Sequence, residues 1–566
     1  MLKTCANLWC RKSFEVTDSD LQFLDKVSPV IGGKKLSLPP PSLCYDCRQQ
    51  RRLAMRNERN LYKRTCDLCK RAVISIYTPD SAHTVYCPEC WWGDKWDPLV
   101  FGRPFDPSRP FFTQFGELYA ATPKMSTFRM DSDINSDYTH DGYRLKNCYF
   151  IFDGEQAYDC FYGECYVKIK DCCDFLYITD SELCYECIHC QNCFDLRYSS
   201  FCRNCSGSAF LLDCISCKNC IGCVNLAQKE YHIFNESVGK EEFNRRKAEM
   251  NLHTHSGVMR LRDEARKFFL KHPRKAVRGV MNESATGDNI IGCKDSFDCF
   301  DCLDLRDCKH CTGCMMGGQD MQDVDAWGDR LTLAYNCAYV GAGSQNLIGC
   351  YYTALTVSDL MYSIFCMTNS SNLLGCVALK KMKNCILNRQ YPQSEYENLV
   401  HEIVAKMQKV GEWGAFFPPE ISAFGYNETV AQDYYPLSKE EVVKRGWKWR
   451  DVREEIPNTE RVIKARSLPD SIGDIPDDIL NWAVRCEETG KPFKLQKSEL
   501  DLYRRMQIPV PRRHFESRHA LRRSFRNPRK LWDRECAKCR KPIATSYAPE
   551  RSEIVYCENC YLKEVY

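Results

Sequence analysis

The sequence lacks the features that would place it among membrane proteins or several large enzyme classes. No apolar run approaches the ~20 residues needed to cross a bilayer, and the mean hydropathy is −0.47. The opening MLKTCANLWC has no apolar segment, so we expect no signal peptide. Histidine is scarce, with 11 residues, and no glycine-rich phosphate loop, His-Glu-x2-His or Gly-x-Ser-x-Gly motif occurs. We therefore expect a non-enzymatic protein without a membrane-spanning segment.

Cysteine, by contrast, is abundant, with 39 residues in a chain of 566. The count is odd, and many cysteines stand three positions apart, a spacing typical of metal sites and unfavourable for a full set of disulfides. We expect a reducing cytoplasm, in which the thiols are metal ligands or small buried apolar groups. The length exceeds what one hydrophobic core can hold, so several domains are expected.

Charge is distributed unevenly along the chain, although the net charge is only +4. Residues 1–100 carry +5 and residues 481–566 carry +9, whereas the remainder carries −10. Basic ends therefore flank an acidic middle, and a polyanionic partner is expected to bind at the ends.

Pairs of cysteines near both ends predict three zinc sites. A Cys-x2-Cys pair supplies two of the four soft ligands of a tetrahedral zinc ion, and two such pairs complete it. The sequence offers two sets of this kind and a third whose first pair has x4 spacing: Cys66, Cys69, Cys87 and Cys90; Cys536, Cys539, Cys557 and Cys560; and Cys5, Cys10, Cys44 and Cys47. Four-cysteine sets leave no open coordination position, so about three structural zinc ions are expected.

The third set resembles a known family. CANLWCRKSF and PSLCYDCRQQRR match the pattern of a cysteine pair, a phenylalanine, and an extended stretch ending in Pro-x-x-Cys-x-x-Cys-Arg-x-x-Arg. This pattern resembles the zinc-ribbon family of the treble-clef type over about 50 residues. The layout of most of the chain is also similar to a group of cysteine-rich bacterial proteins, a resemblance that implies no particular activity.

The C-terminal end is a copy of the whole 1–95 unit. Aligning Cys536 with Cys66 superimposes SRHALRRSFRN on CRQQRRLAMRN. The copy has changed its first ligand set, which now reads Cys486, Thr489, His514 and Ser517. Because threonine and serine are poor zinc ligands, we expect no metal there.

Arginines recur four residues apart in both copies, at Arg48, Arg52 and Arg56 and at Arg518, Arg522 and Arg526. On a helix this spacing places them on one face, where guanidinium groups could follow a phosphate backbone. Trp91, Trp92 and Trp96 could stack on exposed bases. Two alternatives remain open: the arginines pair with the acidic middle of the chain, or they form a solvated surface.

The middle of the chain shows a period of three. From Cys148 to Leu226 every third residue is small, apolar or a cysteine, and none is charged. A helix or a long strand cannot keep such positions on one face, whereas a β-solenoid built from three-residue units can. The runs of Cys-x2-Cys at 184–193 and 214–223 leave an iron–sulfur cluster as an alternative, although they lack the x3 gap and proline of a ferredoxin. A further alternative is extra metal binding by the stacked cysteines.

We therefore predict a multidomain, mainly β protein with zinc-ribbon or treble-clef modules at both ends of a cysteine-rich β-solenoid in two segments with capping helices. The expected boundaries are 1–95 (zinc modules), 96–145 (connector), 146–236 (solenoid), 237–288 (helical insertion), 289–390 (second solenoid segment), 391–480 (helical and mixed cap) and 481–566 (degenerate copy). The leading functional hypothesis is a cytoplasmic zinc protein that contacts nucleic acid through its basic ends. The alternatives are a protein-interaction scaffold with structural zinc, and an iron–sulfur or redox protein.

Overall fold

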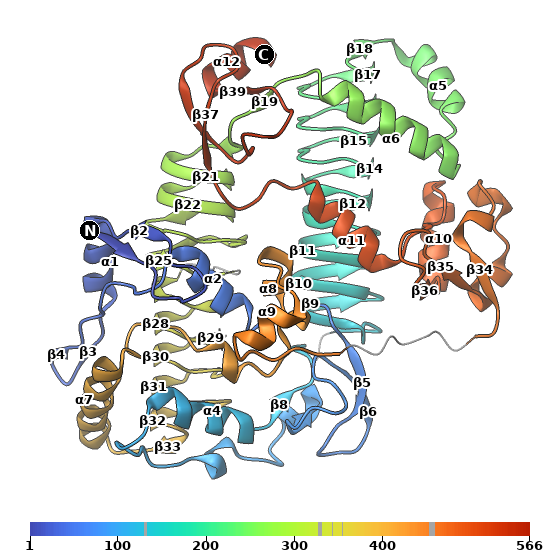
Figure 1. Cartoon of the computed structure of the whole chain (residues 1–566). Coiled ribbons are helices and arrows are strands. Elements are labelled where there is room, and N and C mark those ends of the chain that lie inside the picture. The colour runs from blue at the N-terminus through green and yellow to red at the C-terminus, as the bar shows by residue number, and fades with distance from the viewer. Residues whose placement is uncertain (130–132, 326–330, 342, 354, 452–458, 566) are drawn as a thin grey trace. The chain divides into compact units, whose positions relative to one another are not determined.

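The computed structural model describes all residues except 130–132, 326–330, 342, 354, 452–458 and 566. The chain forms two compact units, each built from two separate segments (Figure 1). Unit 1 contains residues 1–126 and 277–451, and unit 2 contains residues 127–276 and 452–566. The predicted mainly β character is confirmed. Within the described residues, no helix has the length and apolar character that crossing a bilayer requires.

Unit 2 contains a stack of parallel strands that we call the first stack. Neighbouring strands are twelve residues apart in sequence, as in the pairing of Ile151 with Gly163. An antiparallel strand, β18, ends the stack. The strands are β9 (Thr139–Lys146), β10 (Tyr149–Tyr158), β11 (Phe161–Lys170), β12 (Leu176–Tyr185), β13 (Ile188–Gln191), β14 (Phe194–Arg197), β15 (Ser206–Ala209), β16 (Lys218–Ile221), β17 (Glu230–Ile233) and β18 (Glu236–Ser237).

Unit 1 contains a second stack with a looser repeat. Through its middle, strands pair thirteen residues apart, as in Thr332 with Gln345 and Gln345 with Ser358. The strands are β20 (Gly279–Val280), β21 (Glu283–Ile291), β22 (Lys294–Leu303), β23 (Leu305–Arg306), β24 (Gly318–Gln319), β25 (Met321–Gln322), β26 (Thr332–Tyr335), β27 (Ala338–Val340), β28 (Gln345–Ile348), β29 (Tyr351–Thr353), β30 (Ser358–Met361), β31 (Ser371–Leu374), β32 (Lys383–Ile386) and β33 (Arg389–Gln390).

The three-residue period has a backbone cause. In the first stack every third residue from Asn147 to Phe234 has a positive φ, and the residue after it is the one that points inward. Asparagine and aspartate tolerate this left-handed conformation better than other non-glycine residues, which explains the recurring Asn/Asp-Cys pairs. Their side chains also join successive turns, as when Asn147 Nδ2 donates to Asp159 Oδ1 at 2.9 Å.

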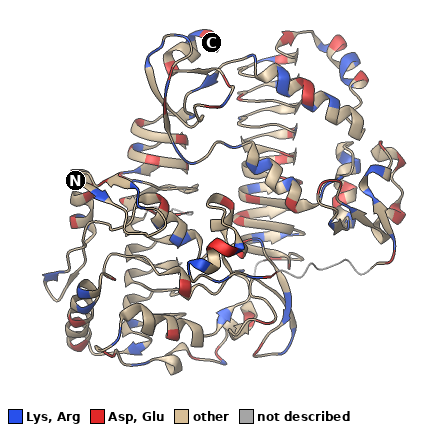
Figure 2. Ribbon diagram, viewed as in Figure 1, with Lys and Arg blue, Asp and Glu red and all other residues tan. Residues whose placement is uncertain are grey.

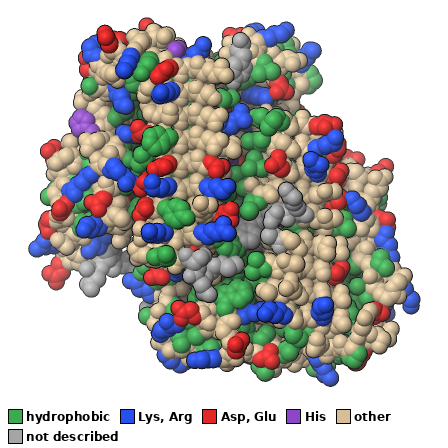
Figure 3. Space-filling model, turned by 180° about the vertical axis from the view of Figure 1, so that it is seen from behind, with side chains coloured by type: hydrophobic (Ala, Val, Ile, Leu, Met, Phe, Trp, Pro, Cys, Tyr) green, Lys and Arg blue, Asp and Glu red, His purple; other side chains and the backbone are tan. Residues whose placement is uncertain are grey.

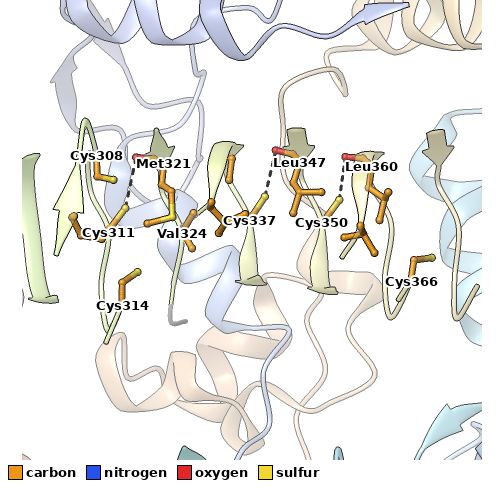
Figure 4. Packing of buried hydrophobic residues seen from close by; sticks show 14 of the residues in the cluster. Cys308, Cys311, Cys314, Met321, Val324, Cys337, Leu347, Cys350, Leu360 and Cys366 are labelled. Carbon is orange, nitrogen blue, oxygen red and sulfur yellow. Dashed lines mark hydrogen bonds between the residues drawn. The ribbon is translucent and has the colours of Figure 1, made fainter. Parts of the chain in front are cut away.

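Cysteines fill the interior of both stacks. Their thiols donate to main-chain carbonyl groups of the next turn, for example from Cys337 to Leu347 at 3.5 Å and from Cys350 to Leu360 at 3.3 Å (Figure 4). These cysteines are fully buried beside leucine, valine and methionine. A thiol therefore serves as a small apolar group that also satisfies a carbonyl oxygen.

Each stack ends in an asparagine that imitates one further turn. Asn388 accepts from the Val377 N–H at 2.8 Å and donates to the Val377 carbonyl at 2.9 Å. Asn235 makes the same two bonds with Val224. These amides satisfy backbone groups that the last turn would otherwise leave unpaired.

In unit 1, the N-terminal module and several helices pack around the second stack. The module contains β1 (Leu2–Thr4), β2 (Ser13–Glu15), α1 (Asp18–Val27), β3 (Val30–Ile31), β4 (Lys34–Lys35), α2 (Tyr45–Leu53), β5 (Tyr62–Thr65), β6 (Ala72–Ser75), β7 (Val85–Tyr86) and α3 (Pro88–Trp92). The other elements are α4 (Phe111–Ala121), β8 (Lys124–Met125), α7 (Gln393–Val410), α8 (Val430–Tyr434) and α9 (Lys439–Lys444).

In unit 2, the C-terminal copy packs with the first stack. Its elements are β34 (Val462–Lys464), β35 (Ala483–Arg485), β36 (Pro492–Phe493), α10 (Lys497–Met506), α11 (Phe515–Ser524), β37 (Trp532–Glu535), β38 (Pro542–Thr545), β39 (Val555–Tyr556) and α12 (Glu558–Val565). The insertion after the stack forms α5 (Lys240–Glu249), α6 (His255–Phe269) and β19 (Arg274–Lys275). Helix α5 begins after Gly239.

The two modules pair alike with the segments around them. In unit 1, β7 pairs in parallel with β8, and in unit 2, β39 pairs in parallel with β19. Each partner strand follows a helix, α4 or α6. Each unit therefore contains a terminal module, a helix followed by a strand, and a stack, although these parts lie in separate segments of the sequence.

Candidate metal centres

Three groups of four cysteines have the geometry of metal sites. Within each group all four Sγ atoms lie within 4.8 Å of one another. The distances are 3.7 Å between Cys10 and Cys44, 3.8 Å between Cys69 and Cys87, and 3.7 Å between Cys539 and Cys557. A tetrahedron with a metal–sulfur bond of ~2.3 Å has an edge of ~3.8 Å. The three predicted sets are thus assembled, and each could hold a metal ion.

The same local structure builds all three groups. The third cysteine donates its backbone N–H to the Sγ of the first cysteine, at 3.2 or 3.3 Å in the pairs Cys44–Cys5, Cys87–Cys66 and Cys557–Cys536. In the first two groups the third cysteine is also the N-cap of a short helix, α2 or α3. Backbone donors and a helix N-terminus favour thiolate, which is the metal-binding form.

Neighbouring groups lower the pKa of individual site cysteines. The hydrogen bond with the Cys47 thiol is the main influence that lowers the pKa of Cys44 to about 5. Hydrogen bonding from Arg71, whose Nε lies 3.5 Å from the sulfur, lowers the pKa of Cys69 to about 6. At neutral pH both groups therefore contain a thiolate ready to bind a cation.

The altered fourth set forms no comparable group. Cys486 accepts from the Thr489 N–H at 3.5 Å, and its sulfur lies 3.8 Å from Ser517 Oγ. The His514 ring accepts from the Glu516 N–H at 3.2 Å. Among the described residues, the groups that could hold a metal ion do not include this set. Its helix, α11, nevertheless forms as α2 does, so the fold tolerates the loss of the ligands.

The N-terminal arginines are buried against the second stack. Arg48 Nε lies 2.5 Å from Asp323 Oδ2, and Arg52 Nε lies 2.5 Å from Asp325 Oδ2. The Arg52 side chain is 0% exposed. Arg56 follows one turn later and donates to the Asp325 carbonyl at 3.2 Å. Helix α2 is thus fastened to the stack by a row of charge-assisted hydrogen bonds.

The C-terminal arginines repeat this arrangement on the first stack. Arg518 and Arg522 both bind the carboxylate of Asp174, which is 0% exposed, and Arg522 does so at 2.6 Å. Arg526 lies over the Tyr177 ring, 4.4 Å from its centroid, and donates to His189. In Figure 2 the ribbon of α11 carries blue segments, which mark its Lys and Arg residues.

The contacts of the six arginines bear on the nucleic-acid hypothesis. Five of the six are buried, and all of them bind side chains or carbonyl groups of the neighbouring stack. Their guanidinium groups are therefore occupied within the molecule and do not form a surface stripe for phosphates. The sequence had left this pairing open as an alternative, and the aspartates that receive the arginines were not identified from sequence.

The tryptophans have a similar internal partner. The Lys380 Nζ lies 4.1 Å from the Trp91 ring centroid, 4.9 Å from that of Trp92 and 5.7 Å from that of Trp96. It also donates to the Trp91 carbonyl at 2.5 Å. All three rings thus contact a lysine of the second stack, and these cation–π contacts help to anchor α3.

The cysteine runs of the first stack follow the interior pattern. Cys184, Cys187 and Cys190 each donate to a carbonyl two residues earlier and to another nine residues later. In the second stack, burial raises the pKa of Cys366 to about 12. These thiols thus satisfy backbone carbonyl groups in the interior of the stacks.

Comparison with known proteins adds no family. No family model and no curated protein matches the chain. One solved structure that is similar to it is named a "putative acetyltransferase" from Desulfovibrio desulfuricans G20. It shares 9% identity, covers 48% of this chain and 68% of its own, and has a TM-score of 0.11. A likeness this weak supports no conclusion about fold or activity.

Proposed function

We propose that this protein is a non-enzymatic scaffold in which three structural zinc ions shape two terminal modules, and each module is fastened to a rigid β-solenoid. Zinc suits the sites because four thiolates at tetrahedral spacing match its preference and leave no open position for catalysis. The two strand stacks would be the solenoids, since each turn contributes one strand to a continuous parallel ladder.

The observation that carries this proposal is the burial of the arginine stripe. A helix that presented arginines to nucleic acid would keep them exposed, whereas Arg52 and Arg522 are 0% and 3% exposed and bind aspartates of the stacks. The basic modules therefore use their charge to assemble the protein itself. This favours the scaffold over the nucleic-acid hypothesis.

The surface agrees with a scaffold that binds proteins. On the face seen in Figure 3, basic, acidic and apolar side chains are interspersed and no single sign of charge dominates. A mixed surface of this kind suits protein partners better than a polyanion, which requires a clustered basic patch. The reduced interior thiols further suggest the cytoplasm as the compartment.

Two measurements on the full-length, metal-loaded protein test this function. Partners captured from a lysate should survive nuclease treatment, and fluorescence anisotropy with RNA and DNA oligonucleotides should show no tight binding at low salt. Loss of all partners after nuclease, or oligonucleotide affinity that falls by orders of magnitude between ~50 and ~200 mM salt, would contradict the scaffold and restore the nucleic-acid hypothesis.

A further inference from the structure

A small, strongly charged cavity lies in unit 2 beside the altered fourth ligand set. Its volume is about 60 Å³. It is partly open to solvent and is lined by residues of β12, α6, α11 and the loop before α11. Four arginines and two glutamates line it: Arg262, Arg512, Arg513, Arg518, Glu186 and Glu487. Cationic groups thus outnumber carboxylates around a space suited to one small polar group.

Two of the four arginines are already neutralised at short range. Arg262 lies 2.6 Å from Glu186. Arg518 binds Asp174, which does not line the cavity. These two guanidinium groups line the cavity, and neighbouring carboxylates balance their charges.

The other two arginines are held only loosely. Arg512 lies 3.6 Å from Asp470, whose two oxygens already accept from Ser256, and it donates to the Leu468 carbonyl at 3.4 Å. Arg513 Nε lies 3.3 Å from Glu487 and 3.4 Å from Glu488. Among the described residues neither guanidinium group makes a hydrogen bond to a carboxylate, so both keep donors for an additional anionic acceptor.

At this place the two copies share their backbone structure but differ in the charges that they carry. In unit 1 the Ala6 N–H donates to the Ser42 carbonyl at 2.9 Å, and in unit 2 the Glu487 N–H donates to the Arg512 carbonyl at 3.1 Å. The equivalent positions thus carry Ala6 and Ser42 in the N-terminal copy and Glu487 and Arg512 in the C-terminal copy. Arg513 likewise replaces Leu43. The copy that lost its metal ligands has gained the charges that line the cavity.

We propose that this cavity binds a small oxyanion, a phosphate or carboxylate group, between Arg512 and Arg513. Guanidinium groups bind such oxygens through charge-assisted hydrogen bonds, and a partly enclosed site strengthens these bonds relative to the open surface. His255 at the cavity wall agrees with a positive surrounding, because burial and then the charge of Arg512 lower its pKa. The proposal is independent of the scaffold function.

Calorimetry on the full-length protein tests the site, with inorganic phosphate and acetate as separate probes. Arg512→Gln combined with Arg513→Gln should weaken binding by at least ~tenfold. The matched control is Arg485→Gln, an exposed arginine of the same module that does not line the cavity. Absence of binding for both probes, or a double variant within ~twofold of the wild type, would overturn the proposal.

A second measurement needs no variant and covers the case in which the double variant does not fold. An arginine-specific dicarbonyl reagent is applied to the wild type, and modified peptides are quantified by mass spectrometry. Phosphate or acetate should protect Arg512 and Arg513 but leave Arg485 reactive. Equal protection of all three arginines would contradict a small-oxyanion site in this cavity. Protection by a single-stranded oligonucleotide but by neither small anion would contradict it as well.

Discussion

Replacing Asp174 by asparagine tests the arginine anchors most sharply. The carboxylate is 0% exposed and receives both Arg518 and Arg522, which are 5% and 3% exposed. Removing the charge leaves Arg522 without its carboxylate and Arg518 with only Glu499, 3.7 Å away, and breaking a buried ion pair from one side typically costs ~3–5 kcal/mol. Asp174→Asn should therefore loosen α11 from the first stack.

Hydrogen exchange followed by mass spectrometry measures this effect locally. If the lost free energy lowers the cost of opening α11 locally, amide exchange in residues 515–524 should accelerate by roughly a hundredfold or more. Helix α2 of unit 1 serves as an internal control and should not change. Glu182→Gln is the matched control, because its pair with Lys170 is 41% and 51% exposed and such pairs contribute at most ~1 kcal/mol.

The result that would refute this reasoning is equally specific. Acceleration within about fivefold, the range of an exposed pair, would mean that the arginines contribute little to holding the module. Adding Arg518→Met and Arg522→Met to Asp174→Asn should recover part of the protection, because the unpaired buried cations are removed while asparagine keeps the left-handed backbone at position 174 (φ 57°).

Two further predictions concern unit 1. Burial lowers the pKa of Lys124 to about 7, so between pH ~7 and ~10 the unfolded chain binds a proton that the folded side chain has released. The free energy of unfolding of the wild type minus that of Lys124→Met, from urea titrations, should therefore rise with pH by up to ~1.4 kcal/mol per unit, and a difference that does not change with pH would contradict this. Asn388→Ala should cost ~1–3 kcal/mol by unpairing the Val377 N–H and carbonyl. Asn346→Ala, at an exposed link between turns, should cost less in the same urea titration, and an equal cost would contradict the capping role.

Much of the metal chemistry could be predicted from sequence because it is local. Each four-cysteine set consists of two closely spaced cysteine pairs that a hairpin brings together. Cys66 and Cys90 could therefore be assigned to one site from the sequence. The period of three was visible for the same reason. The cause of this period is a residue with positive φ before each inward-pointing position. The recurring Asn/Asp-Cys pairs contain that residue, but the sequence interpretation rested on the cysteine alone.

The partners of the arginines could not be predicted, because they are set by tertiary packing. Asp174 lies 344 residues from Arg518, and Asp323 lies 275 residues from Arg48. No local pattern distinguishes these aspartates from the many others on the stacks. Identical arginine spacing was therefore compatible with a phosphate-binding face and with a buried anchor, and only the fold separates the two.

The metal content of the purified protein tests the central claim most directly. Elemental analysis should give three zinc ions per chain and no iron; Cys69→Ser combined with Cys87→Ser should reduce this to two, whereas Cys486→Ser should leave three. Iron, fewer than two zinc ions, or a count that does not respond to the paired substitution would contradict the account.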